Sequence, residues 1–248
     1  MKVIVTANPV ELGKNAGLEA AKRIREAIAA NGYANIILAT GTSQFETLKT
    51  LTAQEIDWSR VVMFHLDEYI GLPETAPASF RKYLKERFLA NLPPLKAVYL
   101  VNGEADPAAE CERLGEMIRR QPIDVALVGI GENGHLGFND PPADFETNQP
   151  FIVVRLDEDC RRQQLAEGWF DTLEAVPGRA ITMSIRQILA SRQIICSVPD
   201  SRKAAAVRDT LQRSISNLNP ASILQSHPAC TCYLDKASAE LLDQNALL

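Results

Sequence analysis

The sequence predicts an α/β fold, in which helices cover both faces of a doubly wound, mainly parallel and Rossmann-like sheet. Short, nearly continuous apolar runs alternate with longer amphipathic runs along the chain, and this alternation is typical of buried parallel strands joined by helices. The 248 residues include 46% hydrophobic and 23% charged residues, which suits one large core better than two small ones. We therefore expect residues 1–248 to form a single domain.

The first half of the chain opens with an apolar run at residues 2–7, which predicts a strand. Over residues 11–31, Leu, Ala and Ile recur at helical spacing, and Gly32 is placed to end the predicted helix. The run at 35–40 is almost wholly apolar and predicts the second strand. The same criteria predict a helix at 45–51, a strand at 61–66, a helix at 78–91, a strand at 97–101 and a helix at 106–120.

The second half contains the most convincing buried strand, at residues 124–130, followed by a long irregular segment at 131–150. A loop of that length inside a compact domain is uncommon, and its glycines and polar groups favour a functional role. The remaining apolar and amphipathic runs predict a strand at 151–156, a helix at 158–170, a helical or mixed segment at 180–190, a strand at 194–198, a helix at 201–212, a short helix at 221–226 and a strand at 231–234.

Composition excludes several classes of function. The net charge of −5 argues against a general nucleic-acid surface. No apolar run approaches the ~18 residues needed to span a bilayer, and the apolar N-terminal run is too short for a signal peptide. The five cysteines include no C-x-x-C pair, so we expect reduced packing residues in a cytoplasmic protein and no metal site.

In doubly wound sheets, ligands bind beyond the carboxyl ends of the strands. The first such end is Thr40-Gly41-Thr42-Ser43. Glycine lets the backbone approach an anion, a helix N-terminus offers free N–H groups, and the hydroxyls add donors. The alternative is an ordinary helix cap, because Ser and Thr are good capping residues.

The second strand end carries two adjacent carboxylates, Asp67 and Glu68, which could include a general base. Neighbouring strand residues point to opposite faces, so the two carboxylates are expected to have different roles. The alternative is that both are solvated in a loop. His65, within the same strand, is interpreted as structural.

The third strand end is the run 129–142, which has four glycines in nine residues and one of the three histidines of the chain, His135. Clustered glycines indicate unusual backbone angles or close approach to a ligand. A histidine of near-neutral pKa can pass a proton to or from a sugar oxygen, and Asp140 could orient it. A fourth element, Lys203 at a helix start, opposes the helix dipole and so suggests a nearby anion, with a solvated surface lysine as the alternative.

Together these motifs resemble the glucosamine-6-phosphate deaminase/isomerase family of the 6-phosphogluconolactonase-like superfamily. The resemblance runs from about residue 5 to residue 242, and its anchors are 66–72, 129–139, 176–177 with 180–183, 201–204 and 220–228. It implies a hydrolase/isomerase of amino-sugar metabolism that converts glucosamine 6-phosphate to fructose 6-phosphate and ammonia. It also implies no cofactor and a small sugar phosphate as the partner; a homo-oligomer is compatible with it.

The resemblance assigns roles to single residues. Asp67 matches the base that moves a proton between C1 and C2, and His135 matches the group that assists ring opening. Asn133 stands where relatives carry Asp or Asn, and Asp140 stands where they usually carry Glu, so both join the predicted catalytic set. The predicted substrate and phosphate contacts are Thr40, Gly41, Thr42, Ser43, Glu68, Gly134 and Lys203.

Two departures from the family pattern concern the phosphate site. Thr42 stands where the family typically has a second glycine. Relatives often carry an arginine just before an aromatic pair, but here Glu167 and Gly168 precede that pair. Arg161 or Arg162 are candidates to replace the missing arginine.

Two other functions compete with this interpretation. A 6-phosphogluconolactonase-type hydrolase shares the fold and the glycine-histidine loop, but needs no enolising aspartate. A catalytically inactive sugar-phosphate-binding regulator should lack the base or the histidine, or carry a DNA-binding segment. The runs 67–71 and 138–141 favour the deaminase.

Overall fold

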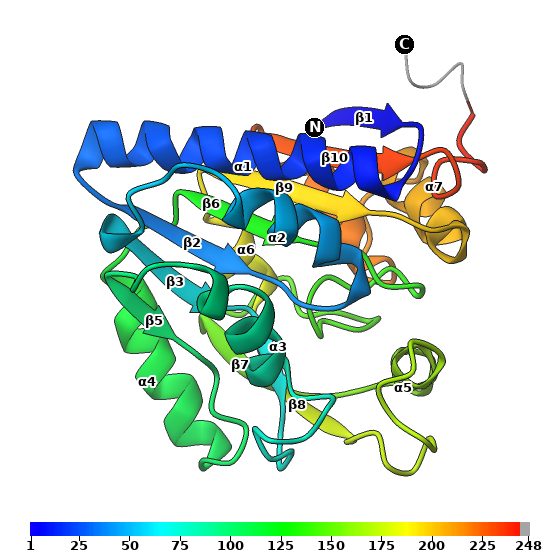
Figure 1. The fold of residues 1–248 in the computed structure, drawn as a ribbon. Helices are drawn as coiled ribbons and strands as arrows, with labels where there is room; N and C mark the ends of the chain where they lie inside the picture. Colours follow the sequence, from blue (N-terminus) through cyan, green and yellow to red (C-terminus); the bar gives the residue numbers. More distant parts are fainter. Residues whose placement is uncertain (244–248) are drawn as a thin grey trace.

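A seven-stranded parallel sheet forms the centre of the molecule, with the strand order β1-β10-β9-β6-β2-β3-β5 (Figure 1). The computed structural model describes residues 1–243. The order confirms the predicted doubly wound class. The strands are β1 (Lys2–Thr6), β2 (Ala34–Leu38), β3 (Val61–His65), β5 (Ala97–Tyr99), β6 (Val125–Val128), β9 (Gln193–Val198) and β10 (Cys230–Asp235).

Helices cover both faces of this sheet, and each face has its own apolar core. Ile36 and Leu38 of β2 point into a core with the helices of one face, whereas Ile37 points into the core of the opposite face. This alternation follows from the two-residue period of a strand. The first face carries α1 (Pro9–Asn31), α2 (Phe45–Thr52) and α3 (Phe80–Arg87); the second carries α4 (Pro107–Arg119), α6 (Ile185–Leu189) and α7 (Ala204–Gln212).

The first helix shows how the sequence sets its ends. The side chain of Asn8 accepts a hydrogen bond from the N–H of Glu11, and Pro9 occupies the first turn, so α1 begins two residues before the predicted start. Gly32, with φ of 81°, ends the helix as predicted. The predicted helix at 78–91 is instead divided, because α3 stops at Arg87 and a separate short turn follows. The 3-10 turns are η1 (Thr42–Gln44), η2 (Trp58–Arg60), η3 (Leu89–Asn91), η4 (Ser201–Lys203) and η5 (Pro220–Ser226).

A second, antiparallel sheet was not predicted. It has the order β4-β8-β7 and consists of β4 (Asp67–Tyr69), β8 (Arg179–Met183) and β7 (Phe151–Arg155). The segment predicted as helical or mixed at 180–190 is therefore a strand followed by α6. Helix α5 (Glu158–Ala166) is shorter than the predicted 158–170, since Gly168 with φ of 79° stops it.

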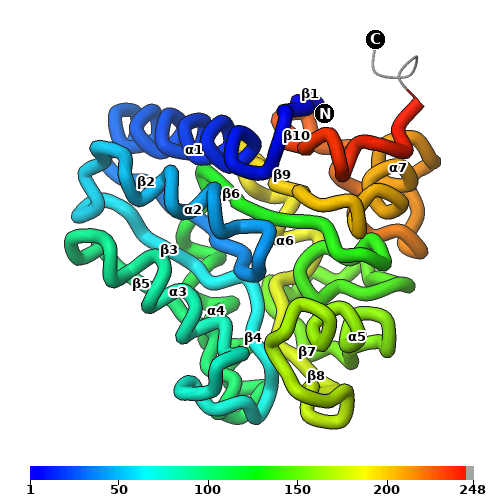
Figure 2. The backbone as a smooth tube through the Cα atoms, turned by 45° about the vertical axis from the view of Figure 1, so that its right-hand side comes forward, coloured from blue at the N-terminus to red at the C-terminus, as the bar shows by residue number. Residues whose placement is uncertain are grey.

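The arrangement of the main sheet determines where ligands can enter. From β2 the chain proceeds outward through β3 and β5, and then returns to place β6 on the other side of β2. The loops after β2 and β6 therefore diverge and leave a crevice at the carboxyl ends of these two strands. In Figure 2, α5 lies beside the small sheet, below the loops that leave the main sheet.

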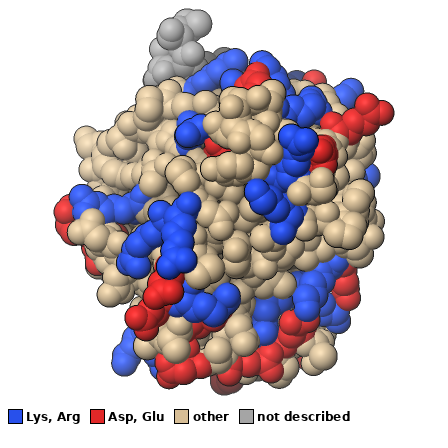
Figure 3. Space-filling model, turned by 90° about the vertical axis from the view of Figure 1, so that its left-hand side faces the viewer, with Lys and Arg blue, Asp and Glu red and all other residues tan. Residues whose placement is uncertain are grey.

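The surface carries both signs of charge. On the face drawn in Figure 3, basic and acidic side chains are interspersed. Among residues 1–243, no helix is both long and apolar enough to cross a membrane.

Candidate active site

Seven of the predicted site residues meet in one cavity at the crevice between β2 and β6. They are Thr40, Gly41, Thr42, Ser43, Asp67, His135 and Lys203. Residues from α3, α5 and the loop after β6 also line the cavity, and none of them was predicted as a site residue: Phe80, Phe138, Gln163, Gln164 and Glu167. A larger cavity of about 1090 Å³ lies at α4 and β7; it includes Asp140 but neither Asp67 nor Lys203.

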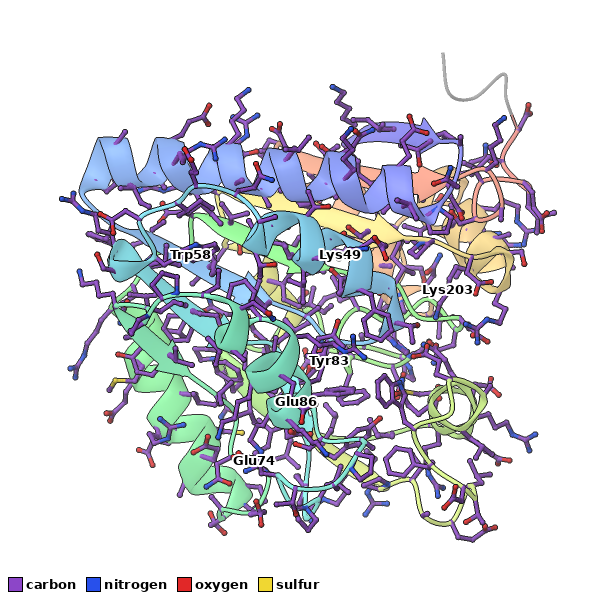
Figure 4. The ribbon with its side chains drawn as sticks, in the orientation of Figure 1. Lys49, Trp58, Glu74, Tyr83, Glu86 and Lys203 are labelled. Atoms are coloured by element: carbon purple, nitrogen blue, oxygen red, sulfur yellow. The ribbon has the colours of Figure 1, made fainter. Side chains whose placement is uncertain are left out.

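The loop after β2 has the backbone of an anion site. Gly41 adopts φ of 94°, a conformation that favours glycine, and the chain then turns through η1 into α2. The hydroxyl of Tyr83 donates to the carbonyl of Gly41 at 3.0 Å and holds the loop from α3 (Figure 4). The hydroxyls of Thr42 and Ser43 both line the cavity.

Asp67 is buried and is the first residue of β4, which begins one residue after the end of β3. Burial, together with the neighbouring charge of Glu68, raises its pKa to about 8, against a backbone hydrogen bond from Phe138 that lowers it. A carboxylate with a pKa near neutrality is a stronger base than an ordinary aspartate and is suited to accept a proton from carbon.

Glu68 is buried and is not among the residues that line the cavity of Asp67, so its predicted contact with the substrate stays a prediction. Its carboxylate accepts hydrogen bonds from the Ser79 hydroxyl at 2.9 Å and from the backbone N–H of Arg81 at 2.8 Å. The Arg81 guanidinium pairs with it at 3.3 Å. The alternation of strand side chains separates the two carboxylates: Asp67 faces the ligand, and Glu68 anchors the start of α3.

His135 lies against Asp140, with 3.2 Å between Nδ1 and the carboxylate. The Asn133 amide donates to the carboxylates of Asp140 and Asp157, each at 3.0 Å, and its oxygen accepts the N–H of His135. Burial alone would raise the pKa of Asp140, but hydrogen bonds from His135 and Asn133 and the charge of His135 bring it below its ordinary value. Asp140 therefore presents a carboxylate to His135.

Two predicted site residues act through their neighbours. Asn133 does not line the cavity but hydrogen-bonds to both Asp140 and His135, so its predicted catalytic role stays a prediction that would act through these two neighbours. Gly134 is also outside the cavity wall: its φ is 83°, and a Cβ there would lie 2.4 Å from Oδ1 of Asn219. The turn and this close approach are enough to require glycine here, and the predicted ligand contact of Gly134 stays a prediction.

Lys203 is the last residue of η4, directly before α7, and its side chain is buried. Figure 4 labels this side chain. Its ammonium lies 3.9 Å from Glu132 and 4.0 Å from Glu167. Burial lowers the pKa of this lysine, while the charges of both carboxylates act to raise it. Lys203 thus brings a buried positive charge to the same cavity as Thr42.

This constellation matches a known family. The model of the family described as glucosamine-6-phosphate isomerases/6-phosphogluconolactonase matches residues 7–232. The chain belongs to this family. A glucosamine-6-phosphate deaminase of Lactobacillus delbrueckii subsp. bulgaricus is 36% identical over 245 residues, covering 98% of this chain and 100% of the relative. One of Bacillus thuringiensis is 36% identical over the same share of this chain and 90% of its own length.

Solved structures of the family have the same fold. A monomeric glucosamine-6-phosphate deaminase superposes with a TM-score of 0.88 at 33% identity, over 97% of this chain and all of that one. A 6-phosphogluconolactonase from Trypanosoma brucei has a TM-score of 0.80 at 19% identity over 98% of each chain. The latter likeness concerns the fold alone.

Within this family pattern, neither candidate for the missing arginine reaches the cavity. The Arg161 guanidinium donates to the carbonyls of Leu173 and Val176, and Arg162 pairs with Glu158 at the surface. Arg202 lies closer, in the wall of an adjoining cavity of about 420 Å³ that also includes Lys203.

One group of side chains has metal-ligand chemistry. The ligand atoms of His135, Asp140 and Cys160 lie within 4.8 Å of one another. Asp140 also accepts hydrogen bonds from Asn133 and from the backbone of Asp157, so its oxygens have partners without an ion. The expectation that this family member uses no metal therefore stays a prediction.

Proposed function

We propose that this chain converts glucosamine 6-phosphate to fructose 6-phosphate and ammonia. The observation that carries the proposal is the single cavity that buried Asp67 and His135 share with Thr42 and Lys203. The first two groups suit proton transfer, and the last two suit a phosphate. The relatives that are 36% identical carry the same activity in their names.

The chemistry assigns each group a step. The phosphate is held by the loop of Gly41–Ser43 and by Lys203, and this remote binding fixes the sugar. His135, held by Asp140, passes a proton to the ring oxygen as the ring opens. Asp67 takes the proton from C2 and returns it to C1, which leaves an imine at C2. Water adds to C2 and ammonia leaves, so the overall equation takes up one water; the hydrolase name describes only this last part.

The pKa of Asp67 fits this sequence. A pKa of about 8 keeps most of the empty enzyme protonated at neutral pH. The ammonium of a bound amino sugar brings a positive charge near this carboxylate and favours its ionised form. The substrate therefore helps to generate the base that acts on it.

The experiment that tests the proposal places two assays side by side, ammonia release from glucosamine 6-phosphate and hydrolysis of 6-phosphogluconolactone. We expect ammonia release, and we expect Asp67→Asn to reduce it by about 10²–10⁴-fold while inorganic phosphate still binds. Fast lactone hydrolysis without ammonia from any amino-sugar phosphate would transfer the assignment to the lactonase. Full ammonia release in Asp67→Asn would remove Asp67 from the role of base.

Location and assembly belong to the proposal as well. A cytoplasmic site of action fits a sugar-phosphate substrate and five unpaired cysteines. One relative of known structure is a monomer, and we propose a homo-oligomer as the alternative state of this chain. Light scattering of the protein as it elutes from a size-exclusion column distinguishes a monomer from an oligomer.

A further inference from the structure

The cations and hydroxyls of the expected phosphate subsite face a carboxylate of the protein itself, that of Glu167. Its Oε2 accepts a hydrogen bond from the Thr42 hydroxyl at 3.4 Å, and its Oε1 lies 4.0 Å from the Lys203 ammonium. Both the Glu167 and the Lys203 side chains are only 5% exposed. A negative group therefore already occupies the region where the phosphate is expected.

The position of Glu167 on its helix makes this contact notable. Glu167 is the C-cap of α5, and Gly168 ends the helix behind it. A carboxylate near a helix C-terminus is disfavoured by the helix dipole, which prefers a cation there. Gln163 and Trp169 donate hydrogen bonds to the carboxylate at 2.8 and 3.3 Å. These hydrogen bonds and the charge of Lys203 therefore offset the unfavourable interaction of the Glu167 carboxylate with the helix dipole.

A phosphate on Lys203 and Thr42 would meet the Glu167 carboxylate directly. The cavity that holds Asp67 measures about 70 Å³, and the adjoining cavity of about 420 Å³ is lined by the same Thr42, Glu167 and Lys203. Glu167 is therefore part of the wall wherever these two groups are open to a ligand. The two separations from Lys203 to carboxylates, 3.9 and 4.0 Å, exceed hydrogen-bond distance, so the ammonium retains donors for a further oxygen. A phosphate that enters must therefore displace the Glu167 carboxylate, because like charges at this distance repel each other.

We propose that Glu167 is a specificity-determining residue, an internal anion that competes with the substrate phosphate for Lys203 and Thr42. The inference rests on the proposed function, in which these two residues bind the phosphate. The competition lowers the apparent affinity for the phosphate by the fraction of molecules in which Glu167 holds the site. It also returns a partner to Lys203 when the product leaves. A singly charged ligand gains less from displacing Glu167 than a doubly charged phosphate does, so the exchange selects dianions over weaker anions.

A purely structural ion pair makes the opposite prediction. If Glu167 served only to neutralise buried Lys203, phosphate would bind to the parent while Glu167 kept its contacts with Thr42 and Trp169. Its replacement would then strengthen anion binding through charge alone, and phosphate would not change the emission of Trp169 in the parent. The response of Trp169 to phosphate in the parent therefore separates the two roles.

The test uses inorganic phosphate and the fluorescence of Trp169, whose indole N–H contacts Glu167. The chain has two tryptophans, and Trp58→Phe leaves Trp169 as the single reporter. In this background we expect phosphate to change the Trp169 emission, and Glu167→Gln to lower the Kd for phosphate about tenfold. Glu174→Gln, an exposed glutamate of the same segment, is the matched control and is expected to keep the parent Kd.

A second variant guards against a folding defect in Glu167→Gln. Glu167→Asp keeps the charge but shortens the side chain, so its Kd should lie between those of the parent and of Glu167→Gln. An unchanged or higher Kd in Glu167→Gln, with the fold retained by circular dichroism, overturns the inference, as does a lack of phosphate binding in parent and variant alike. Tighter phosphate binding without ammonia release from any amino-sugar phosphate would support the inference and overturn the proposed reaction.

Discussion

The imidazole of His135 lies directly on the backbone of Gly131. A Cβ built at Gly131 would lie 2.2 Å from Cε1 and 2.3 Å from Nε2 of that ring, far inside van der Waals contact. The N–H of Gly131 also donates to the carbonyl of His135 at 3.0 Å. The glycine therefore fixes the position of the ring relative to the cavity.

Gly131→Ala should displace His135 and reduce kcat for ammonia release by roughly 10²-fold. Gly178→Ala is the control, because Gly178 has no atom within 4 Å of the added Cβ, and its kcat should equal that of the parent. Equal activity in Gly131→Ala would mean that the ring shifts without consequence, and His135 would then lose its assigned role.

Asp140 acts on the reaction through His135. Asp140→Asn removes the charge that faces Nδ1, and we expect kcat to fall by roughly 10²-fold while KM changes little, because Asp140 lies outside the substrate cavity. Asp144→Asn, an exposed change on the same loop, serves as the control. A rise in KM at constant kcat would place Asp140 among the substrate contacts instead.

The sequence predicted the parts of the site that depend on strand ends. Loops after parallel strands meet at the same edge, so the predicted Thr42, Asp67 and His135 do share one cavity. Lys203 was predicted from a local conflict with the helix dipole. These inferences need only the order of the elements and the chemistry of single residues.

The remaining wall depends on tertiary structure that no local pattern encodes. Glu167 appeared in the sequence only as a departure from the family pattern, and its contact with Thr42 spans 125 positions. The small sheet was missed because β4 is three residues long and follows β3 after a single residue. The alternation of strand side chains indicates that Glu68 and Asp67 point to different faces. It does not predict that Ser79 and Arg81 contact the Glu68 carboxylate, and Glu68 was therefore assigned to the substrate.

Glu68 offers a test of whether it contacts the substrate or stabilises the fold. It is buried with Arg81, and Glu68→Gln replaces a carboxylate oxygen that accepts several donors with an amide group. Breaking such a buried pair should lower the free energy of unfolding by about 3–5 kcal/mol, with KM unchanged. Glu74→Gln alters a half-buried partner of the same arginine, at 3.9 Å, which also pairs with Lys85; it should cost less than about 1 kcal/mol. A raised KM at full stability would instead return Glu68 to the substrate site.

Removal of metal ions tests the group formed by His135, Asp140 and Cys160. Because the carboxylate of Asp140 already has hydrogen-bond partners, we expect dialysis against a chelator to leave ammonia release and thermal stability unchanged. Cys160→Ser should behave like the parent in the same assay. Loss of activity that added zinc restores, and that Cys160→Ser abolishes, would identify a resident metal.

The raised pKa of Asp67 predicts how stability depends on pH. Between its ordinary value of 3.8 and about 8, folded Asp67 holds a proton that the unfolded chain has released, so folding binds protons and stability falls as pH rises through this window. One such group contributes a slope of at most about 1.4 kcal/mol per pH unit. Asn cannot titrate, so Asp67→Asn should show a flatter curve and exceed the parent in stability above the window. Urea unfolding at a series of pH values measures the difference, with Asp171→Asn, an exposed change, as the control. Parallel curves for parent and Asp67→Asn would show that Asp67 ionises at an ordinary pH, and the base would then need another source of its strength.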